Sequence, residues 1–333
     1  MKALIDKMLI LVTVSIALIF AAPAANAQYT SQLDEKAIPV GDFAGIHVDS
    51  DFEVTLSNGP CNVKVTADKM LSPYVQVYVR GRVLYITYDS KAVPKDVRNL
   101  YKGRNAPKPV FRANITLPEL SSVYLEDNAV LTGADDMECR MTTEIELIEK
   151  AQIKNLGLNA NAVNVSLKKN AQAALTLKAA TKAEVKTEGN ANLKAQITAH
   201  DIVVNASSSS DLAVTSAGET ITLATSGSSK STVAFNGTKA SVVIGASSQL
   251  NLSGAAETLS VTGEKNASLE ALDFDTKAAD VSLSGSVKAN ITVSDSLDAT
   301  LVGGSTLYYT GDPVFKIGRI VRSTLAPYGS QSK

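Results

Sequence analysis

The sequence has 333 residues, which is enough for a substantial buried core and for one to three domains. Hydrophobic residues make up 45% of the chain and aromatic residues only 5%, with no Trp, so the chain is not disordered and its core must consist of Val, Leu, Ile and Ala. The 32 basic residues balance 33 acidic residues, which argues against a nucleic-acid-binding protein and its basic footprint.

The N-terminus has the pattern of a secretory signal peptide. Lys2 and Lys7 precede an apolar run at 8–22, and the small-residue sequence ANA follows at 25–27. The run is shorter than the roughly 18 to 20 residues that a spanning helix needs. We therefore predict cleavage after Ala27, a linker at 28–37 and an exported chain in the periplasm, on the outer surface or outside the cell, with no later transmembrane segment.

Residues 38–133 form a β region with large side chains, including FAGIHV at 43–48 and FEVTL at 52–56. VQVYV and VLYIT on either side of Gly81 predict a hairpin. The loop at 91–112 carries seven basic residues and one acidic residue, a net charge of +6. Its charges and its tyrosine could hold an anionic glycan or a lipid headgroup, although a flexible, solvated loop is the favoured interpretation. The candidate binding residues in the loop are Arg98, Tyr101, Lys102 and Arg104.

A repeat of 18–22 residues runs through the rest of the chain and predicts a solenoid, with regular coils of about 19–20 residues over 134–307. The repeat starts are Asp127, Glu149, Lys169, Gly189, Ser208, Gly227, Ala246, Lys265, Gly285 and Gly303. The second position of each unit is usually Asn or Ser, as in a tight turn, and the third is almost always Ala or Ser. The fifth is mostly Leu, and alternation of apolar and polar residues continues beyond it, so a strand follows each turn.

The fourth position is polar and should face water, and it supplies a second set of candidate binding residues. They are Asn192, Asp211, Lys230, Gln249 and Lys288. A second break about ten residues into each unit indicates at least two strands and two corners per coil. We therefore predict an all-β fold, a parallel β-solenoid with right-handed winding, in which the Asn and Ser positions form stabilising ladders. An antiparallel sandwich is the alternative fold, but it would not require every corner position to match, and in this sequence the corner positions do match. Residues 308–333 resemble a cap and tail.

The sequence shows no catalytic constellation, so we predict no enzyme, no cofactor and no metal site. Neither His47 nor His200 has a second His or a Cys at metal-ligand spacing, and no position in the coils repeats an acid. Cys61 and Cys139 could pair in an oxidising compartment, but two unpaired, buried thiols are favoured.

Several short motifs, in this order, resemble the exported bacterial autotransporter adhesins with a head GIN domain. They are Phe43 and Ile46 before FEVTL at 52–56, the LYI strand at 84–86, LPEL at 117–120 and YTGDP at 309–313. The resemblance covers roughly residues 38–315 and implies a β-helical envelope or surface module. We expect a non-enzymatic binding module that engages glycan or another envelope component. A structural protein whose coils stack end to end, or that acts through a protein partner, is the alternative, and a polysaccharide-degrading enzyme ranks third. The sequence leaves the oligomeric state open.

Overall fold

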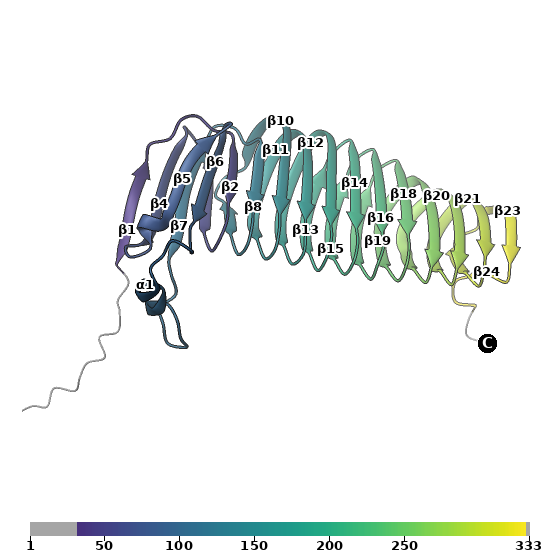
Figure 1. The fold of residues 1–333 in the computed structure, drawn as a ribbon. Coiled ribbons are helices and arrows are strands. Elements are labelled where there is room, and N and C mark those ends of the chain that lie inside the picture. Colours follow the sequence, from purple (N-terminus) through teal and green to yellow (C-terminus); the bar gives the residue numbers. More distant parts are fainter. Residues whose placement is uncertain (1–31, 331–333) are drawn as a thin grey trace, which may run out of the picture.

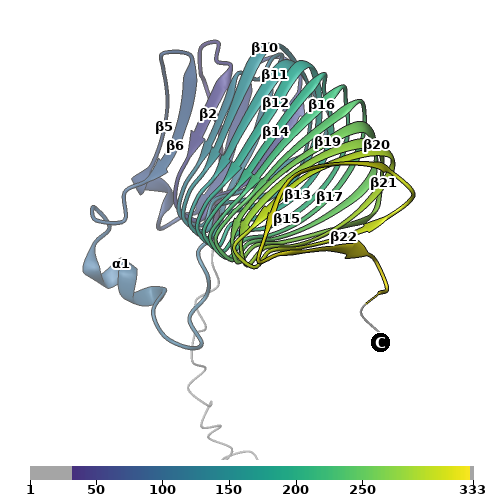
Figure 2. The same cartoon turned by 90° about the vertical axis from the view of Figure 1, so that its right-hand side faces the viewer.

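The computed structural model describes residues 32–330, and the expected signal peptide lies outside these residues. The chain winds into a β-solenoid of about 11 turns, which confirms the predicted parallel β-solenoid (Figure 1). Viewed along the rod, the coils lie almost on top of one another (Figure 2). Each regular coil contains two strands, such as β13 (Asn192–Thr198) and β14 (Asp201–Ala206), and each strand pairs in parallel with its equivalents in the coils before and after it.

The strands form two rows, which we call row A and row B, and the long strands bend from one row to the other. From the N-terminal end, row A contains β1 (Leu33–Ile38), β4 (Asn62–Asp68), β7 (Phe111–Leu117), β3 (Glu53–Asn58), β9 (Val130–Gly133), the first parts of β11 (Gln152–Leu167) and β12 (Gln172–Thr187), β13, β15 (Asp211–Ala217), β17 (Lys230–Asn236), the first parts of β19 (Gln249–Lys265), β20 (Ser268–Gly285) and β21 (Lys288–Val302), β22 (Thr306–Thr310) and β24 (Thr324–Pro327). Row B contains β5 (Val75–Arg80), β6 (Val83–Tyr88), β2 (Gly45–Val48), β8 (Ser122–Leu125), the second parts of β10 (Met137–Leu147), β11 and β12, β14, β16 (Thr220–Thr225), β18 (Lys239–Ile244), the second parts of β19, β20 and β21, and β23 (Val314–Val321). The first residues of β10, 137–139, continue row A after β9.

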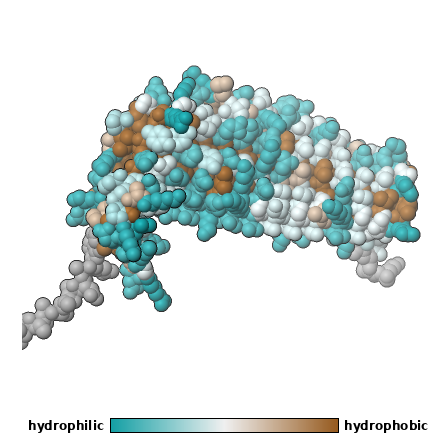
Figure 3. Space-filling model, in the orientation of Figure 1, coloured by the Kyte–Doolittle hydropathy of each residue, from teal (hydrophilic) through white to brown (hydrophobic). Residues whose placement is uncertain are grey.

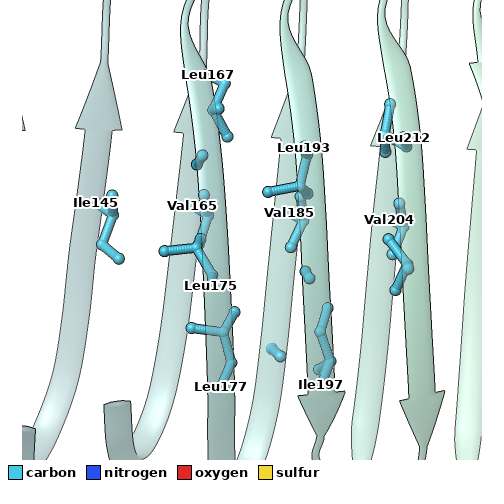
Figure 4. Packing of buried hydrophobic residues seen from close by; sticks show 14 of the residues in the cluster. Ile145, Val165, Leu167, Leu175, Leu177, Val185, Leu193, Ile197, Val204 and Leu212 are labelled. Atoms are coloured by element: carbon cyan, nitrogen blue, oxygen red, sulfur yellow. The ribbon is translucent and has the colours of Figure 1, made fainter. Parts of the chain in front are cut away.

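The core lies between the two rows, because alternate side chains of every regular strand point inward. Val165, Val185 and Val204 pair in register on consecutive strands of row B and stack along the rod, while Leu193 and Leu212 stack opposite them in row A (Figure 4). All five are almost completely buried. Burying a side chain of this size contributes about 1.5–3 kcal/mol, so the repeated inward positions account for most of the stability of the rod.

One corner of every coil contains a residue in the left-handed conformation. The ten residues that start the sequence repeat all have positive φ angles, from 57° at Ala246 to 84° at Gly285, although only four of them are glycine. The carbonyl of this residue accepts a hydrogen bond from the next coil, as when the Asn190 amide donates to Lys169 O at 2.6 Å. Backbone bonds along the rod offset the cost of the left-handed residue, about 1 kcal/mol for a side chain other than glycine.

The first coils extend the same stack but add antiparallel strands to its N-terminal end. β4 pairs antiparallel with β7 and β1 with β4, and β5 pairs antiparallel with β6 in the hairpin expected around Gly81. A 3₁₀ turn (Ser72–Tyr74) leads into β5, and the short helix α1 (Lys95–Leu100) lies between β6 and β7. Phe52 and Phe111, with ring centroids 5.2 Å apart, fill this end of the core.

Of residues 308–333, for which the sequence suggests a cap and tail, the structure describes 308–330, which contain the end of β22, β23 and β24. β22 continues row A in parallel with β21, and β23 and β24 add one further strand to each row. No strand of the described residues lies beyond β23 or β24. The parallel stack therefore continues up to its C-terminal edge, with one register irregularity between β21 and β23.

Candidate functional site

The basic segment at 91–112 is an insertion at a solenoid corner. In the adjacent coil, β2 connects to β3 through a short corner with Ser50 in the left-handed conformation, whereas β6 and β7, their respective partners, are joined by residues 89–110. The sequence favours a flexible, solvated loop here, and the structure places α1 in the segment and buries Val93 and Val97 against the core. Tyr101 also packs partly buried against this core.

The cations of this insertion are exposed and point into solvent. Arg112 lies 3.5 Å from Glu53, and among residues 32–330 the insertion's other six basic side chains form no ion pair. They are Lys91, Lys95, Arg98, Lys102, Arg104 and Lys108. Of the candidate residues in the segment, Arg98, Lys102 and Arg104 are thus accessible to an anion. Only part of the Tyr101 ring is accessible to a ligand, because the rest packs against the core.

A shallow groove of about 410 Å³ lies at the corners of the coils that adjoin the insertion. Tyr88 at the end of β6 and Ser90 in the insertion line it on one side, and Asp51, Asp127 and Glu149 line it from three successive corners. The side-chain amide of Asn128 donates to Asp51 Oδ1 of the adjacent coil at 2.7 Å. Acidic corners therefore lie next to the basic insertion.

Four ring side chains form a continuous ladder on the outer surface of row B, which we call the aromatic ladder. Its members are Tyr78, Tyr85, His47 and Tyr124, from the adjacent strands β5, β6, β2 and β8. Successive ring centroids are 5.1, 4.9 and 4.4 Å apart, and the first two rings are parallel to within 7°. Their neighbours along each strand point inward, so the ladder faces solvent. Tyr78 is its most exposed member, at 44%.

Carboxylates flank this ladder and interact with its histidine. Partial burial lowers the pKa of His47, although Asp49 and Glu126 oppose that change. Burial also raises the pKa of Asp49, whose carboxylate accepts hydrogen bonds from the Ser50 hydroxyl and the Tyr88 amide at 2.9 and 3.2 Å. The surface thus combines half-exposed rings with hydrogen-bond acceptors.

The polar positions predicted on row A do stack in one column, because their strands pair in register. Asn192 lies next to Asp211, Asp211 next to Lys230 and Lys230 next to Gln249, and Ser268 separates Gln249 from Lys288. At about 4.8 Å per strand, the column begins about 19 Å along the rod from β3 and so does not join the basic insertion in one site.

A second groove, of about 440 Å³, lies at the other corner of the last coils. It runs from Gly237 to Gly311 and is lined mainly by small side chains. Of its three charged residues, Lys277 and Glu257 are paired, with Nζ 3.2 Å from Oε1, and Asp275 forms no ion pair with another described residue. The groove therefore has fewer unpaired charged side chains than the N-terminal end.

The remaining candidates are explained by local contacts. His200 lies between Asp201 and Glu219, 3.2 and 2.8 Å away, and no group of three His, Cys, Asp or Glu residues in the described part of the chain is arranged to hold a metal ion. Cys61 and Cys139 are free thiols, and each donates to a different carbonyl, those of Phe43 and Met137. No helix within residues 32–330 is long and apolar enough to cross a membrane.

The aromatic ladder is the feature that sequence reasoning missed. Its four residues come from strands whose order in the sheet is not their order in the chain. The available signal was the alternation itself: each ring lies between two apolar residues of a short strand, as in Ile46-His47-Val48, and is therefore directed outward.

The chain is similar to a known protein family and to several solved structures. Two solved structures named as putative adhesins, from Parabacteroides merdae and Parabacteroides distasonis, are 19% and 18% identical, with TM-scores of 0.32 and 0.41. The match covers 89% of this chain in both cases, and 96% and 97% of the other chains. No curated protein matches the chain. Residues 42–220 and 174–313 match the family described as "Putative auto-transporter adhesin, head GIN domain", and the chain belongs to this family.

Proposed function

We propose that this protein is an exported, non-enzymatic binding module of the cell envelope or surface that engages acidic glycans at its N-terminal end. Family membership supports an adhesive role. The observation that carries the proposal is the proximity, at one end of the rod, of the aromatic ladder and the unpaired cations of the insertion. β6 ends three residues beyond Tyr85, and the insertion follows β6 directly.

The two features provide complementary chemistry for an acidic sugar polymer. Tyrosine side chains combine an apolar ring with a hydroxyl group, and they contribute contact area with little loss of conformational freedom. Arg98, Lys102 and Arg104 would attract the carboxylate or sulfate groups of the polymer. The ring spacing of about 5 Å follows the strand spacing, so a repeating polymer lying along the rod would meet a similar surface at each strand.

Binding of residues 28–333 to an array of neutral, carboxylated and sulfated glycans tests this proposal, with the length of any bound polymer followed over hours. We expect saturable binding to the acidic glycans, weakened by salt, without shortening of the polymer. Shortening would instead indicate an enzyme. Vesicles of anionic lipid form a second arm, and preference for these vesicles over acidic glycans would reject the glycan assignment.

Two matched pairs of variants locate the site. Tyr78→Ala should weaken binding, whereas Tyr328→Ala, which removes a tyrosine of similar exposure from the other end of the rod, should not. Neutralising Arg98, Lys102 and Arg104 to Gln should abolish most binding. Neutralising Lys230, Lys239 and Lys288 to Gln removes the same charge from the middle and C-terminal coils. If the second triple variant has the larger effect, the site lies elsewhere, with the row A column as the first alternative.

A further inference from the structure

The outer surface of row B continues past the aromatic ladder into a hollow of about 350 Å³ over β10, β11 and β12. The last ring of the ladder lies directly beside it, because β8 pairs in parallel with β10 and places Tyr124 next to Glu146. Burial and the carboxylates of Glu126 and Glu146 raise the pKa of Tyr124. The ladder and the hollow therefore form one continuous surface, which is mainly hydrophilic beyond the N-terminal strands (Figure 3).

The strand register places six polar side chains around this hollow in two columns along the rod, each with one residue from β10, β11 and β12. They are Glu144, Asn164 and Glu184 in the first column, and Glu146, Ser166 and Lys186 in the second. The residues between the two columns on β10 and β11, Ile145 and Val165, are buried and point into the core. The six polar side chains therefore point outward, toward a ligand on the surface of the sheet.

The carboxylates of the hollow are held in place by neighbouring donors. Asn164 Nδ2 donates to Glu144 Oε1 at 2.7 Å, and Lys168 Nζ lies 2.6 Å from Glu146 Oε1. Glu184, whose side chain is 21% exposed, lies between two lysine ammonium groups at 2.6 and 2.7 Å, and their hydrogen bonds lower its pKa. A carboxylate has about four acceptor positions, so each of the three keeps free lone pairs for donors on a ligand.

This combination of groups suits an uncharged sugar unit better than an acidic one. A sugar hydroxyl both donates and accepts, so it can donate to a carboxylate while it accepts from the Asn164 amide or the Lys186 ammonium group. Hydrogen bonds of this kind to an ionised partner are the strong ones. The residues that line the hollow include two basic and three acidic side chains, a net charge of 2 − 3 = −1. A sulfate or carboxylate group would be repelled here, whereas the basic insertion attracts it.

We infer that the hollow is a subsite for an uncharged, hydroxyl-rich sugar unit, and that the protein selects glycans that contain both acidic and uncharged units. This inference rests on the proposed function, because the same polymer lies on the ladder and reaches the insertion with its acidic units. From Tyr78 on β5 to Lys186 on β12 there are six strand spacings, about 29 Å at about 4.8 Å each. A polymer with a charge on every unit would place one of its charges in the hollow.

Two acidic probes of equal length test the inference by titration calorimetry of residues 28–333. Hyaluronan oligosaccharides alternate a carboxylated and an uncharged sugar, whereas oligogalacturonate carries a carboxylate on every unit. We expect hyaluronan to bind at least about tenfold more tightly, as one added hydrogen bond to a charged group would provide. Equal affinity for the two probes would overturn the subsite and leave the proposed function standing. If neither probe binds, both proposals are wrong.

Glu144→Ala and Glu270→Ala are a matched pair of variants that locate the subsite. Each removes an exposed glutamate that accepts a hydrogen bond from an asparagine of the next coil, Asn164 at 2.7 Å and Asn290 at 2.6 Å. Glu144→Ala should weaken hyaluronan binding about tenfold and leave oligogalacturonate binding unchanged or tighter, so the ratio of the two affinities falls. Glu270→Ala, on row A, should keep the ratio of the parent. An unchanged ratio in Glu144→Ala, with circular dichroism showing a folded protein, would overturn the inference.

Discussion

Three buried serines in consecutive coils allow the packing of the solenoid to be tested directly. Ser210 and Ser229 occupy the third position of the repeat, where they are at most 1% exposed, and the hydroxyl groups of both have no hydrogen-bond partner. Ser248 occupies the same position one coil later, yet its hydroxyl lies 2.8 Å from Gly245 O and accepts from Thr225 Oγ1 at 3.1 Å. The same substitution should therefore have opposite effects at neighbouring sites.

Ser229→Ala removes a buried hydroxyl whose desolvation is uncompensated, at a cost of about 1–3 kcal/mol in the parent. Alanine already occupies this position at Ala191 and Ala267, so it fits the space. We expect a gain of about 1 kcal/mol in the free energy of unfolding. Ser248→Ala should lose about 1–2 kcal/mol, since it breaks hydrogen bonds and leaves the hydroxyl of Thr225 without its acceptor.

Urea unfolding followed by circular dichroism measures both effects, with Ser210→Ala as a repeat of the Ser229 test. The urea midpoints of two variants can be compared only if their unfolding free energies depend on urea concentration with the same slope. A change in slope would show that the coils no longer unfold cooperatively. If Ser229→Ala destabilises the protein as much as Ser248→Ala does, the hydroxyl of Ser229 is satisfied and the assignment of uncompensated burial is wrong.

Three further predictions concern other parts of the rod. The pKa of His47 is lowered in the folded protein, so neutral His47 stabilises the fold fully above its ordinary pKa of about 6.5. This contribution is lost as the pH falls through the pKa of the folded state. Urea midpoints should therefore fall less between pH 7 and pH 5 for His47→Phe than for the parent. Gly227→Ala should cost about 1–2 kcal/mol in urea unfolding, because φ is 71° and the new Cβ would lie 2.6 Å from Ser208 O; an unchanged midpoint would contradict this. Burial raises the pKa of Cys139, which is 5% exposed, so a thiol reagent should label Cys61 first, and unreduced, denatured protein should show two reactive thiols.

The regular coils could be predicted from the sequence because each residue of a coil has one dominant neighbour in the next. Leu193 and Leu212 belong to the same position of the repeat and lie side by side in the structure, as do Asn170 and Asn190, whose amides hydrogen-bond at 3.2 Å. The left-handed backbone conformation at the first residue of each repeat was less evident from the sequence. Side chains such as Glu149 do not indicate a left-handed residue, because the hydrogen bond along the rod, not the side chain, favours it.

The N-terminal end could not be predicted to the same extent, because its coils are interrupted. The insertion between β6 and β7 hides the equivalence of these strands to β2 and β3, and β1, β4 and β5, which are added through antiparallel pairing, have no counterpart in the repeat. The basic residues were found from composition alone. The aromatic ladder requires knowledge that β6 and β8 lie on either side of β2, which no spacing in the sequence provides.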